Sequence, residues 1–330
     1  MKTTNEAIQP MSQPAETQNY FLDPTKFRNP EQTASGETRA HVTLKKLETL
    51  WINTGTLCNL TCRNCYIESS PRNDRLEYIR HAEVTAYLDE IAQEGLGTQT
   101  IAFTGGEPFL NPDMLAILET TLARGFDVLI LTNATRPMLR PRIKRGLLAL
   151  NEDYGERLTL RVSIDHFDPA WHEHERGAET FEPVIEGLQW LTTNGFNIDI
   201  AGRLFAGDDE ATMRAGYAAL FAARGIQLDA QAPNKLVLFP EMDARLDVPE
   251  ITTGCWDKLG THPDAMMCAS SRMIVKRKGA EQPSVIACTL LPYDERFELG
   301  HRLSDAQQTV ALNHPHCAQF CVLGGASCSG

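Results

Sequence analysis

The sequence lacks long apolar runs and is poor in positive charge. Its 330 residues contain no run of 18 apolar residues, so we expect no transmembrane helix and no membrane partner. Residues 1–18 contain no apolar stretch of the kind that a secretory signal needs, which predicts a cytoplasmic location. The sequence contains 31 Lys and Arg against 43 Asp and Glu, so its net charge is −12. We therefore expect no nucleic-acid partner, since phosphates are bound mainly by Lys and Arg.

Cysteine is absent from residues 66–254, although the chain has nine cysteines. They form two groups, Cys58, Cys62 and Cys65 near the start and Cys255, Cys268, Cys288, Cys317, Cys321 and Cys328 near the end. An odd number of cysteines in a chain without an export signal argues against structural disulfides and favours metal or redox use. Cysteines that merely fill a core would be scattered among apolar positions. The segregation therefore predicts two separate thiolate sites.

Composition divides the chain into three regions. Residues 1–42 are rich in Pro, Thr, Gln, Asn and Glu, which predicts a mostly disordered arm with some packing at Tyr20 and Phe21. Residues 43–249 repeat a short apolar strand, a loop, an amphipathic helix and a glycine stop. Residues 250–330 change to short segments, Gly/Pro turns and cysteines, which predicts a small, cysteine-rich second domain.

The middle region predicts an α/β fold. Six segments are β-branched, aliphatic and almost continuously apolar, as parallel strands covered by helices are. The expected strands are residues 49–55, 99–104, 127–132, 158–164, 197–204 and 235–239. Six units indicate a partial (β/α)6 barrel, because a closed barrel has eight units and about 250 residues. In such barrels the chemistry lies at the carboxyl ends of the strands, so the loops that follow them should carry the motifs.

The first cysteine group follows the first expected strand as a C-x3-C-x2-C array, Cys58 to Cys65. Structural zinc normally takes four protein ligands, and cubane iron–sulfur clusters usually have four cysteine ligands. Three thiolates on one loop would leave one iron of a cubane open to another ligand. A zinc site with a distant fourth ligand is the alternative.

This array resembles the motif of the radical S-adenosylmethionine (SAM) superfamily. The resemblance implies that Cys58, Cys62 and Cys65 ligate a [4Fe–4S] cluster whose open iron binds SAM. It also implies that an electron, from a reductant such as flavodoxin or ferredoxin, cleaves SAM to a 5′-deoxyadenosyl radical that abstracts a substrate hydrogen. The cofactor supplies the difficult chemistry, and the protein supplies position and excludes water.

The segment after the second expected strand resembles the GGEP motif of the same superfamily. Glycines allow close approach of the backbone, and a carboxylate complements the SAM ammonium group. By resemblance this SAM-binding segment is Thr104, Gly105, Gly106, Glu107 and Pro108. Polar residues at the later strand ends resemble positions near the SAM ribose, methionine and carboxylate: Asn133, Ser163, Asp165 and Arg203.

Two further residues are candidate contacts. The residue before the third cysteine is usually aromatic in this superfamily and packs near adenine, but here it is Asn64. Tyr66, just after the cysteines, is therefore the candidate aromatic cofactor contact. His166 directly follows Asp165 and is a candidate substrate contact, because it would face the cavity of the expected barrel.

The second cysteine group resembles the auxiliary-cluster domains called twitch or SPASM, in which a hairpin after the barrel and a later cysteine pair hold a second [4Fe–4S] cluster. Residues 273–275 and 284–286 predict that hairpin. We expect one auxiliary cluster, because the full SPASM set needs more cysteines at tighter spacings. The ligands implied are Cys268, Cys288, Cys317 and Cys321, with Cys255 or Cys328 able to replace one of them. A structural zinc site or free thiols are the alternatives.

The resemblance as a whole implies a radical SAM enzyme with one auxiliary cluster, close in type to the iron–sulfur oxidoreductases grouped with molybdopterin- and nitrogenase-cofactor maturases. The expected substrate is a small metabolite or a peptide. The competing hypotheses are a maturase that crosslinks, epimerises or oxidises a ribosomal peptide, and a non-catalytic iron–sulfur redox or scaffold protein. Residues 326–330 are expected to lie in the cavity or to cover it. The sequence predicts no oligomeric state.

Overall fold

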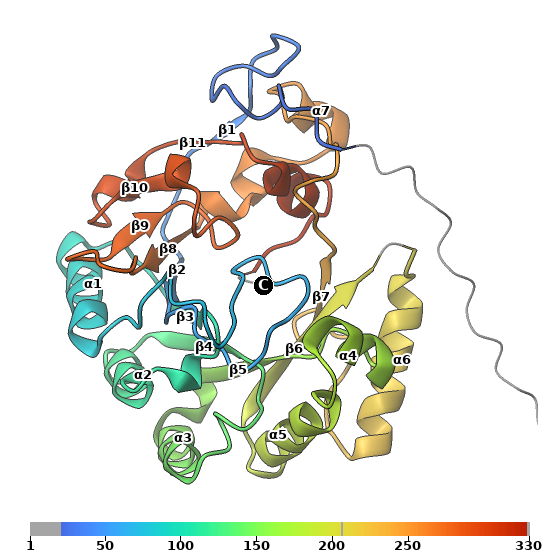
Figure 1. Cartoon of the computed structure of the whole chain (residues 1–330). Helices are drawn as coiled ribbons and strands as arrows, with labels where there is room; N and C mark the ends of the chain where they lie inside the picture. The colour runs from blue at the N-terminus through green and yellow to red at the C-terminus, as the bar shows by residue number, and fades with distance from the viewer. Residues whose placement is uncertain (1–20, 206, 329–330) are drawn as a thin grey trace, which may run out of the picture.

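The computed structural model describes residues 21–205 and 207–328, and it centres on a curved nine-stranded sheet (Figure 1). Six consecutive strands lie side by side in chain order, each parallel to the next. They match the six strands expected from the sequence, with ends shifted by one or two residues. They are β2 (Thr49–Asn53), β3 (Thr100–Thr104), β4 (Asp127–Thr132), β5 (Leu158–Ser163), β6 (Asn197–Leu204) and β7 (Leu236–Pro240).

Helices between these strands cover the outer face of the sheet, as Figure 1 shows. They are α1 (His81–Glu94), α2 (Met114–Ala123), α3 (Pro141–Tyr154), α5 (Phe181–Thr193) and α6 (Glu210–Arg224). The short helix α4 (Pro169–Arg176) precedes α5 in the same connection and lies near the carboxyl ends of the strands. The α/β partial barrel predicted from the sequence is thus confirmed.

The two faces of the sheet belong to two different apolar cores. On β2, Leu50 and Ile52 pack in the core beneath the helices, whereas Trp51 packs in a second core shared with the C-terminal region. Such alternation follows from the two-residue period of a strand, which sends successive side chains to opposite faces. Both faces are covered, which explains why the strands are apolar almost throughout.

The C-terminal region extends the same sheet. Strand β8 (Ser271–Val275) lies parallel to β2 on the side opposite β3 and forms an antiparallel hairpin with β9 (Ser284–Ile286). The expected hairpin is therefore present, and β10 (Glu298–Gly300) pairs with β9 at the edge. The cysteine-rich region accordingly shares its sheet and its inner core with the barrel. This region also contains the short helix α7 (Cys255–Leu259).

The turn of this hairpin is less exposed than its basic sequence suggests. Lys276 is 2% exposed, and its ammonium group lies 2.8 Å from the Glu83 carboxylate of α1. The guanidinium of Arg277 pairs with Glu298 at 2.7 Å. These two charges therefore join the hairpin to the barrel and to its own sheet.

Residues 21–42 are packed, in contrast to the mostly disordered arm expected over 1–42. Phe27 is 3% exposed, and the fully buried Arg39 forms an ion pair with Glu250. Strand β1 (His41–Val42) pairs with β11 (Val310–Ala311). The partners of this segment come from more than 200 residues away, so its own polar composition did not reveal them. Phe21 is 81% exposed, and Tyr20 lies outside the described residues.

Among the described residues, the structure contains no helix that is both long enough and apolar enough to cross a membrane.

Candidate functional site

Three free thiols lie on the loop between β2 and α1, at the carboxyl end of the first barrel strand. Cys58 is buried, whereas Cys62 and Cys65 are half-buried. Backbone N–H groups approach two of the sulfurs: Leu60 donates to Cys58 Sγ at 3.4 Å and Ser69 donates to Cys65 Sγ at 3.4 Å. Such N–H groups favour the thiolate, which is the form that binds metal.

The donor set fits an iron–sulfur cluster better than a single metal ion. Burial, reinforced by the Glu107 carboxylate, raises the pKa of Cys58 to about 12, and the two other thiols act in the same direction. Within residues 21–205 and 207–328, no three His, Cys, Asp or Glu side chains converge as ligands of one ion. A cubane cluster does not need such convergence, because each of its cysteines binds a different iron.

The two glycines of the GGEP segment let the loop after β3 lie against the cysteine loop. A Cβ on Gly106 would lie 2.1 Å from the Leu57 carbonyl oxygen, and one on Gly105 would lie 2.5 Å from the Gly55 carbonyl oxygen. The backbone N–H of Gly106 donates to the Gly55 oxygen at 2.7 Å. These glycines are therefore needed for contact between the two loops, in addition to any approach to a ligand.

Glu107 is the buried acid of this segment, at 1% exposed. Its carboxylate accepts hydrogen bonds from the Thr132 hydroxyl at 2.9 Å and from the Asn133 backbone N–H at 2.9 Å. Burial raises the pKa of Glu107 to about 7, although these hydrogen bonds oppose the shift. The Asn133 side chain in turn lies 3.8 Å from Cys58 Sγ. Thr104 and Pro108 are buried at either end of the segment.

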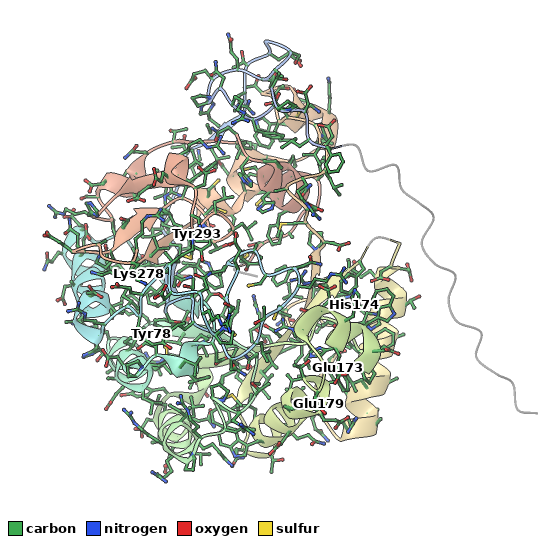
Figure 2. The ribbon with its side chains drawn as sticks, viewed as in Figure 1. Tyr78, Glu173, His174, Glu179, Lys278 and Tyr293 are labelled. Atoms are coloured by element: carbon green, nitrogen blue, oxygen red, sulfur yellow. The ribbon has the colours of Figure 1, made fainter. Side chains whose placement is uncertain are left out.

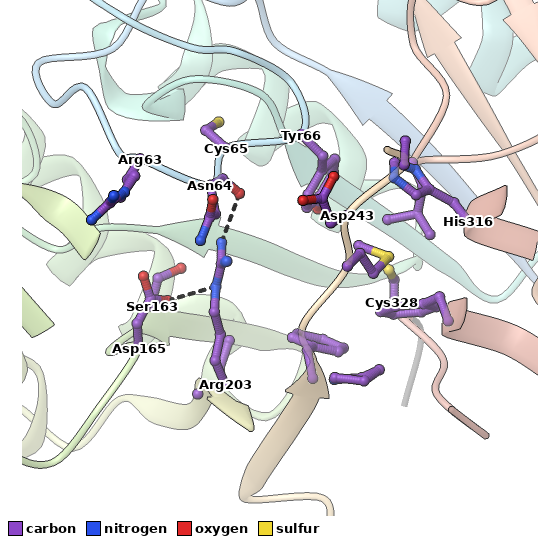
Figure 3. A pocket seen from close by; sticks show the side chains of 18 of the residues that line it. Arg63, Asn64, Cys65, Tyr66, Ser163, Asp165, Arg203, Asp243, His316 and Cys328 are labelled. Atoms are coloured by element: carbon purple, nitrogen blue, oxygen red, sulfur yellow. Dashed lines mark hydrogen bonds and ion pairs between the residues drawn. The ribbon is translucent and has the colours of Figure 1, made fainter. Parts of the chain in front are cut away.

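A cavity of about 490 Å³ lies next to the cysteine loop (Figure 3). Its walls include polar residues that the sequence placed at strand ends, as well as side chains of the C-terminal region. The predicted site residues among its lining are Cys65, Tyr66, Ser163, Asp165, Arg203 and Cys328. The structure therefore brings most of the strand-end candidates into one space.

A buried charge network forms one wall of this cavity. Asp165 accepts a hydrogen bond from Arg176 at 2.9 Å and lies 3.6 Å from Arg203 (Figure 3). The Arg203 guanidinium also donates to the Asn64 backbone carbonyl oxygen at 2.9 Å, and it lies 3.9 Å from the Glu175 carboxylate. Among the described residues, Asp165 Oδ2 and Arg176 Nε have no hydrogen-bond partner. Both residues line the cavity, and these two atoms are themselves buried.

Arg176 and Glu175 were not expected from the sequence. They belong to α4, whose segment His172–Arg176 does not match the zinc-binding HExxH pattern. The sequence feature that indicates this helix is Asp168-Pro169, which lies three residues after the strand-end acid Asp165. In the structure the Asp168 side chain caps the helix by accepting a hydrogen bond from the Ala170 backbone N–H at 2.8 Å. This geometry turns the polar end of α4 toward the cavity.

The remaining barrel candidates lie differently. His166 is 7% exposed and packs among Phe167, Trp171 and Phe205, and it is not part of the lining of the cavity. Tyr66 lines the cavity on the side of the C-terminal region. Its phenol pKa is raised by burial and further by Cys328, Cys65 and Cys288, which places the ring between the two cysteine groups.

A second, apolar cavity contains four thiols of the C-terminal region. They come from three segments: Cys268 lies before β8, Cys288 lies after β9, and Cys317 and Cys321 lie on one short π-helix, Cys317–Val322. Burial raises the pKa of all four thiols, and other thiols of the set raise the pKa of Cys288, Cys317 and Cys321 further. The four cysteines favoured by the sequence are thus the four that the fold gathers.

The two alternative cysteines lie elsewhere. The Cys255 sulfur accepts a hydrogen bond from the Thr252 backbone N–H at 3.3 Å and lines neither cavity. Cys328 lines the first cavity, where burial raises its pKa to about 11 and its sulfur accepts a hydrogen bond from Thr289 at 3.5 Å. Its position also shows that the C-terminal segment reaches the first cavity, as far as residue 328.

A buried arginine, Arg272, lies next to the thiols of the second cavity. Arg272 is 1% exposed and donates to the Cys268 carbonyl oxygen at 2.6 Å. Burial lowers its pKa to about 10, and the neighbouring Cys268 and Cys288 oppose this shift. The guanidinium therefore supplies a positive charge near thiolates that would otherwise be expensive to bury.

The fold and the site define a class: a parallel α/β partial barrel that carries three thiols after its first barrel strand. Residues 52–211 match the Radical SAM superfamily. This part of the chain, just under half of its length, is therefore similar to a radical SAM domain, and members of that superfamily are enzymes that use a [4Fe–4S] cluster and SAM.

Comparison with characterised proteins shows several relatives of different activity. The chain is 29% identical over 149 residues to the antilisterial bacteriocin subtilosin biosynthesis protein AlbA of Bacillus subtilis, covering 45% of this chain and 31% of AlbA. It is 30% identical over 144 residues to the AdoMet-dependent heme synthase of Methanosarcina barkeri, covering 43% of this chain and 38% of the synthase. A GTP 3′,8-cyclase of Tolumonas auensis is 30% identical over 141 residues, 42% of this chain and 39% of the cyclase. The matches thus span well under half of each relative.

Two solved structures share the fold. Streptococcus suis SuiB bound to S-adenosylmethionine superposes with a TM-score of 0.55 at 14% identity, over 77% of this chain and 63% of SuiB. The structure of anSMEcpe with bound AdoMet gives a TM-score of 0.56 at 14% identity, over 80% of this chain and 81% of anSMEcpe. At these identities the likeness concerns the fold.

Proposed function

We propose that this chain is a cytoplasmic enzyme that reductively cleaves SAM and uses the resulting 5′-deoxyadenosyl radical to abstract hydrogen from a small metabolite or a peptide. The observation that carries this proposal is the placement of three free thiols on one loop, with Cys65 lining the first cavity and Cys58 next to Asn133 and the buried Glu107. A reductant such as flavodoxin or ferredoxin would supply the electron.

The residues of the first cavity would have distinct roles. Cys58, Cys62 and Cys65 would hold the SAM cluster, which when bound supplies the electron for cleavage of the sulfonium. Glu107 would pair with the SAM ammonium group, since a buried carboxyl with a pKa near 7 gains its charge most readily beside a cation. Asp165 and Arg176 would be an acceptor and a donor for polar groups of SAM or of the substrate, since both side chains line the first cavity.

The second cavity would hold one auxiliary [4Fe–4S] cluster, ligated by Cys268, Cys288, Cys317 and Cys321. Four thiolates occupy all four irons of a cubane, so no open iron remains for substrate. Leu290 and His316 line both cavities and would form the wall between them. This arrangement favours a role in electron transfer over a role as a substrate anchor. In this proposal residues 43–249 form the SAM-binding domain and 250–330 the auxiliary domain.

A ribosomal peptide is the second candidate substrate. Two observations favour it: AlbA takes part in bacteriocin biosynthesis, and SuiB has been solved bound to its precursor peptide SuiA, in a structure with a TM-score of 0.53 to this chain. The first cavity also offers apolar wall residues beside its charges, including Phe239, Met242 and Phe320, which suit a side chain of a peptide.

Anaerobic reconstitution with iron and sulfide, followed by SAM and dithionite, tests the central proposal. We expect about eight irons per chain, four for each cubane, and formation of 5′-deoxyadenosine measured by chromatography and mass spectrometry. About eight irons without 5′-deoxyadenosine would favour the non-catalytic scaffold instead. About four irons with 5′-deoxyadenosine would remove the auxiliary cluster and keep the enzyme.

The ligand set of the second cavity has a separate test. Cys288→Ala should bind about four irons and Cys328→Ala about eight, because Cys328 faces the first cavity. The reverse result would place Cys328 among the ligands.

A further inference from the structure

Asn64 lies between two cysteines of the first site, at the position where an aromatic residue was expected. The side-chain amide of Asn64 donates a hydrogen bond to the Glu175 carboxylate at 3.0 Å. The backbone carbonyl oxygen of Asn64 accepts one from Arg203 at 2.9 Å. Asn64 is therefore tied to α4 on one side and to the end of β6 on the other. Both ties hold the short span from Cys62 to Cys65.

Helix α4 contacts the neighbouring loop residue as well. The Arg63 backbone N–H donates to the Glu175 carbonyl oxygen at 2.7 Å, and the Arg63 guanidinium contacts the His174 ring. Both residues between Cys62 and Cys65 thus touch the last turn of this helix, and Figure 2 shows His174 on α4 beside the loop. The other side of the loop is held independently, since Tyr293 donates to the Ile67 carbonyl oxygen at 2.7 Å.

Glu175 is the central residue of these contacts. It is 4% exposed, which is unusual for a glutamate unless it is paired. With Asp165 it balances two cations, Arg176 and Arg203, so the wall of the cavity is a closed set of two acids and two bases. A carboxylate in such a set is held in one position, because moving it would leave a buried cation unpaired.

We propose that Glu175 is a positioning residue that fixes the Cys62–Cys65 span through the Asn64 side chain. The inference rests on the proposed function, since the span has to hold two cluster ligands. Residues that contact ligands from outside orient them, and their loss typically lowers metal affinity or activity by about 10- to 100-fold.

Glu175→Ala and Asn64→Ala test the contact from its two ends. Each should slow dithionite-driven formation of 5′-deoxyadenosine roughly 10- to 100-fold and alter the EPR spectrum of the reduced SAM cluster. The double variant should be no slower than the slower single variant, because both changes remove one interaction. Glu175→Gln should recover most of the rate, since its amide oxygen can accept the same hydrogen bond.

A readout without any cluster separates position from overall stability. In the reduced, metal-free protein, alkylation by iodoacetamide, mapped by mass spectrometry, should become several-fold faster at Cys62 and Cys65 in both alanine variants, because the span opens locally. Cys317, in the second cavity, should react as in the wild type. Because Asn64 is exposed, Asn64→Ala should fold, and it tests the contact even if Glu175→Ala does not fold.

Glu173→Gln is the matched control. Glu173 lies on the same helix (Figure 2), but its carboxylate accepts a hydrogen bond from the Phe181 backbone N–H, away from the cysteine loop. It should match the wild type in rate, EPR spectrum and alkylation. Wild-type behaviour of Asn64→Ala and Glu175→Ala, additive effects in the double variant, or failure of Glu175→Gln to recover would each overturn the proposal. A wild type that forms no 5′-deoxyadenosine would overturn the proposed function instead.

Discussion

The two cysteine sites of this chain are built in opposite ways. The first places three thiols on one loop, and its cavity is lined by charged and polar residues from α4 and from the ends of β5 and β6. The second gathers four thiols from three segments, and its lining is almost entirely apolar apart from the sulfurs and His316. Charged side chains therefore accompany the thiol in the lining of the first cavity, whereas apolar side chains surround the thiols of the second.

The difference teaches that thiol burial does not distinguish the two kinds of site. Burial raises the pKa of Cys58 in the first site and of Cys317 in the second, in both cases to about 12. What differs is the surroundings. Asp165 Oδ2 and Arg176 Nε of the first site are buried without a partner, whereas the buried Arg272 of the second site is fully engaged with backbone carbonyls. The first site thus has a buried network of acids and bases beside its thiols, and the second has a buried guanidinium beside apolar side chains.

The largest expected effect separates the two sites by function. Cys58→Ala should abolish formation of 5′-deoxyadenosine, because it removes a ligand of the proposed SAM cluster. Cys288→Ala should lose about half of the iron and still form 5′-deoxyadenosine, since its change lies in the other cavity. The measurement is iron content together with product formation in the two reconstituted variants. Equal loss of product in both would show that the sites do not work independently.

Gly106→Ala should damage the first site while leaving the second intact. A Cβ at this position would lie 2.1 Å from the Leu57 backbone oxygen, next to Cys58, so one of the two loops has to move. We expect a loss of about 1–3 kcal/mol in the free energy of unfolding and a lower iron content in the first site. Gly254→Ala is the control, because the nearest atom to its added Cβ is 3.8 Å away. Denaturant unfolding would measure both variants, and equal stabilities would contradict the expected clash.

The sequence predicted the barrel well because its strands are buried on both faces. Their near-continuous apolar character is a local property, so it can be read without knowing the partners. The cysteine array and the glycines of GGEP are also local, and the structure places them together. The four C-terminal cysteines were found by spacing and resemblance, and their common cavity depends on the β8–β9 hairpin, which the turn sequence predicted.

Features that depend on distant partners could not be predicted in the same way. The packing of residues 21–42 requires the Arg39–Glu250 pair, whose members are 211 residues apart. The role of Glu175 requires knowing which side of α4 meets the cysteine loop, and the polar sequence of α4 does not show this. His166 illustrates the converse error: its position after Asp165 suggested the cavity, but aromatic neighbours hold it outside.

The rate at which iron is removed should differ between the first site and the second. A water-soluble iron chelator added to the reconstituted protein should remove iron in two phases, with the first site losing its share several-fold faster. The reason is that the first cavity is lined by polar, half-buried residues such as Cys65 and Arg203, whereas the second is apolar. SAM should slow only the fast phase. A single phase, unaffected by SAM, would contradict the difference in access.

The last expected effect is a pH dependence confined to the first site, where Glu107 lies. Burial raises the pKa of its carboxyl from 4.5 to about 7 in the folded protein. Because the folded state binds this proton more tightly than the unfolded state, the contribution of Glu107 to stability is fully present below about pH 4.5. It is lost as pH rises from there through about 7, at a slope of at most about 1.4 kcal/mol per pH unit.

Glu107→Gln keeps the shape of the side chain and removes the titration, so the difference between its unfolding curve and that of the wild type isolates this group. In the metal-free protein, the wild type should lose stability relative to the variant between pH 4.5 and 7, and the two should run parallel above that range. Denaturant titrations at four or five pH values measure this difference. Parallel curves throughout would mean that the pKa of Glu107 is the same in the folded and the unfolded protein, so that its hydrogen bonds from Thr132 and Asn133 offset its burial.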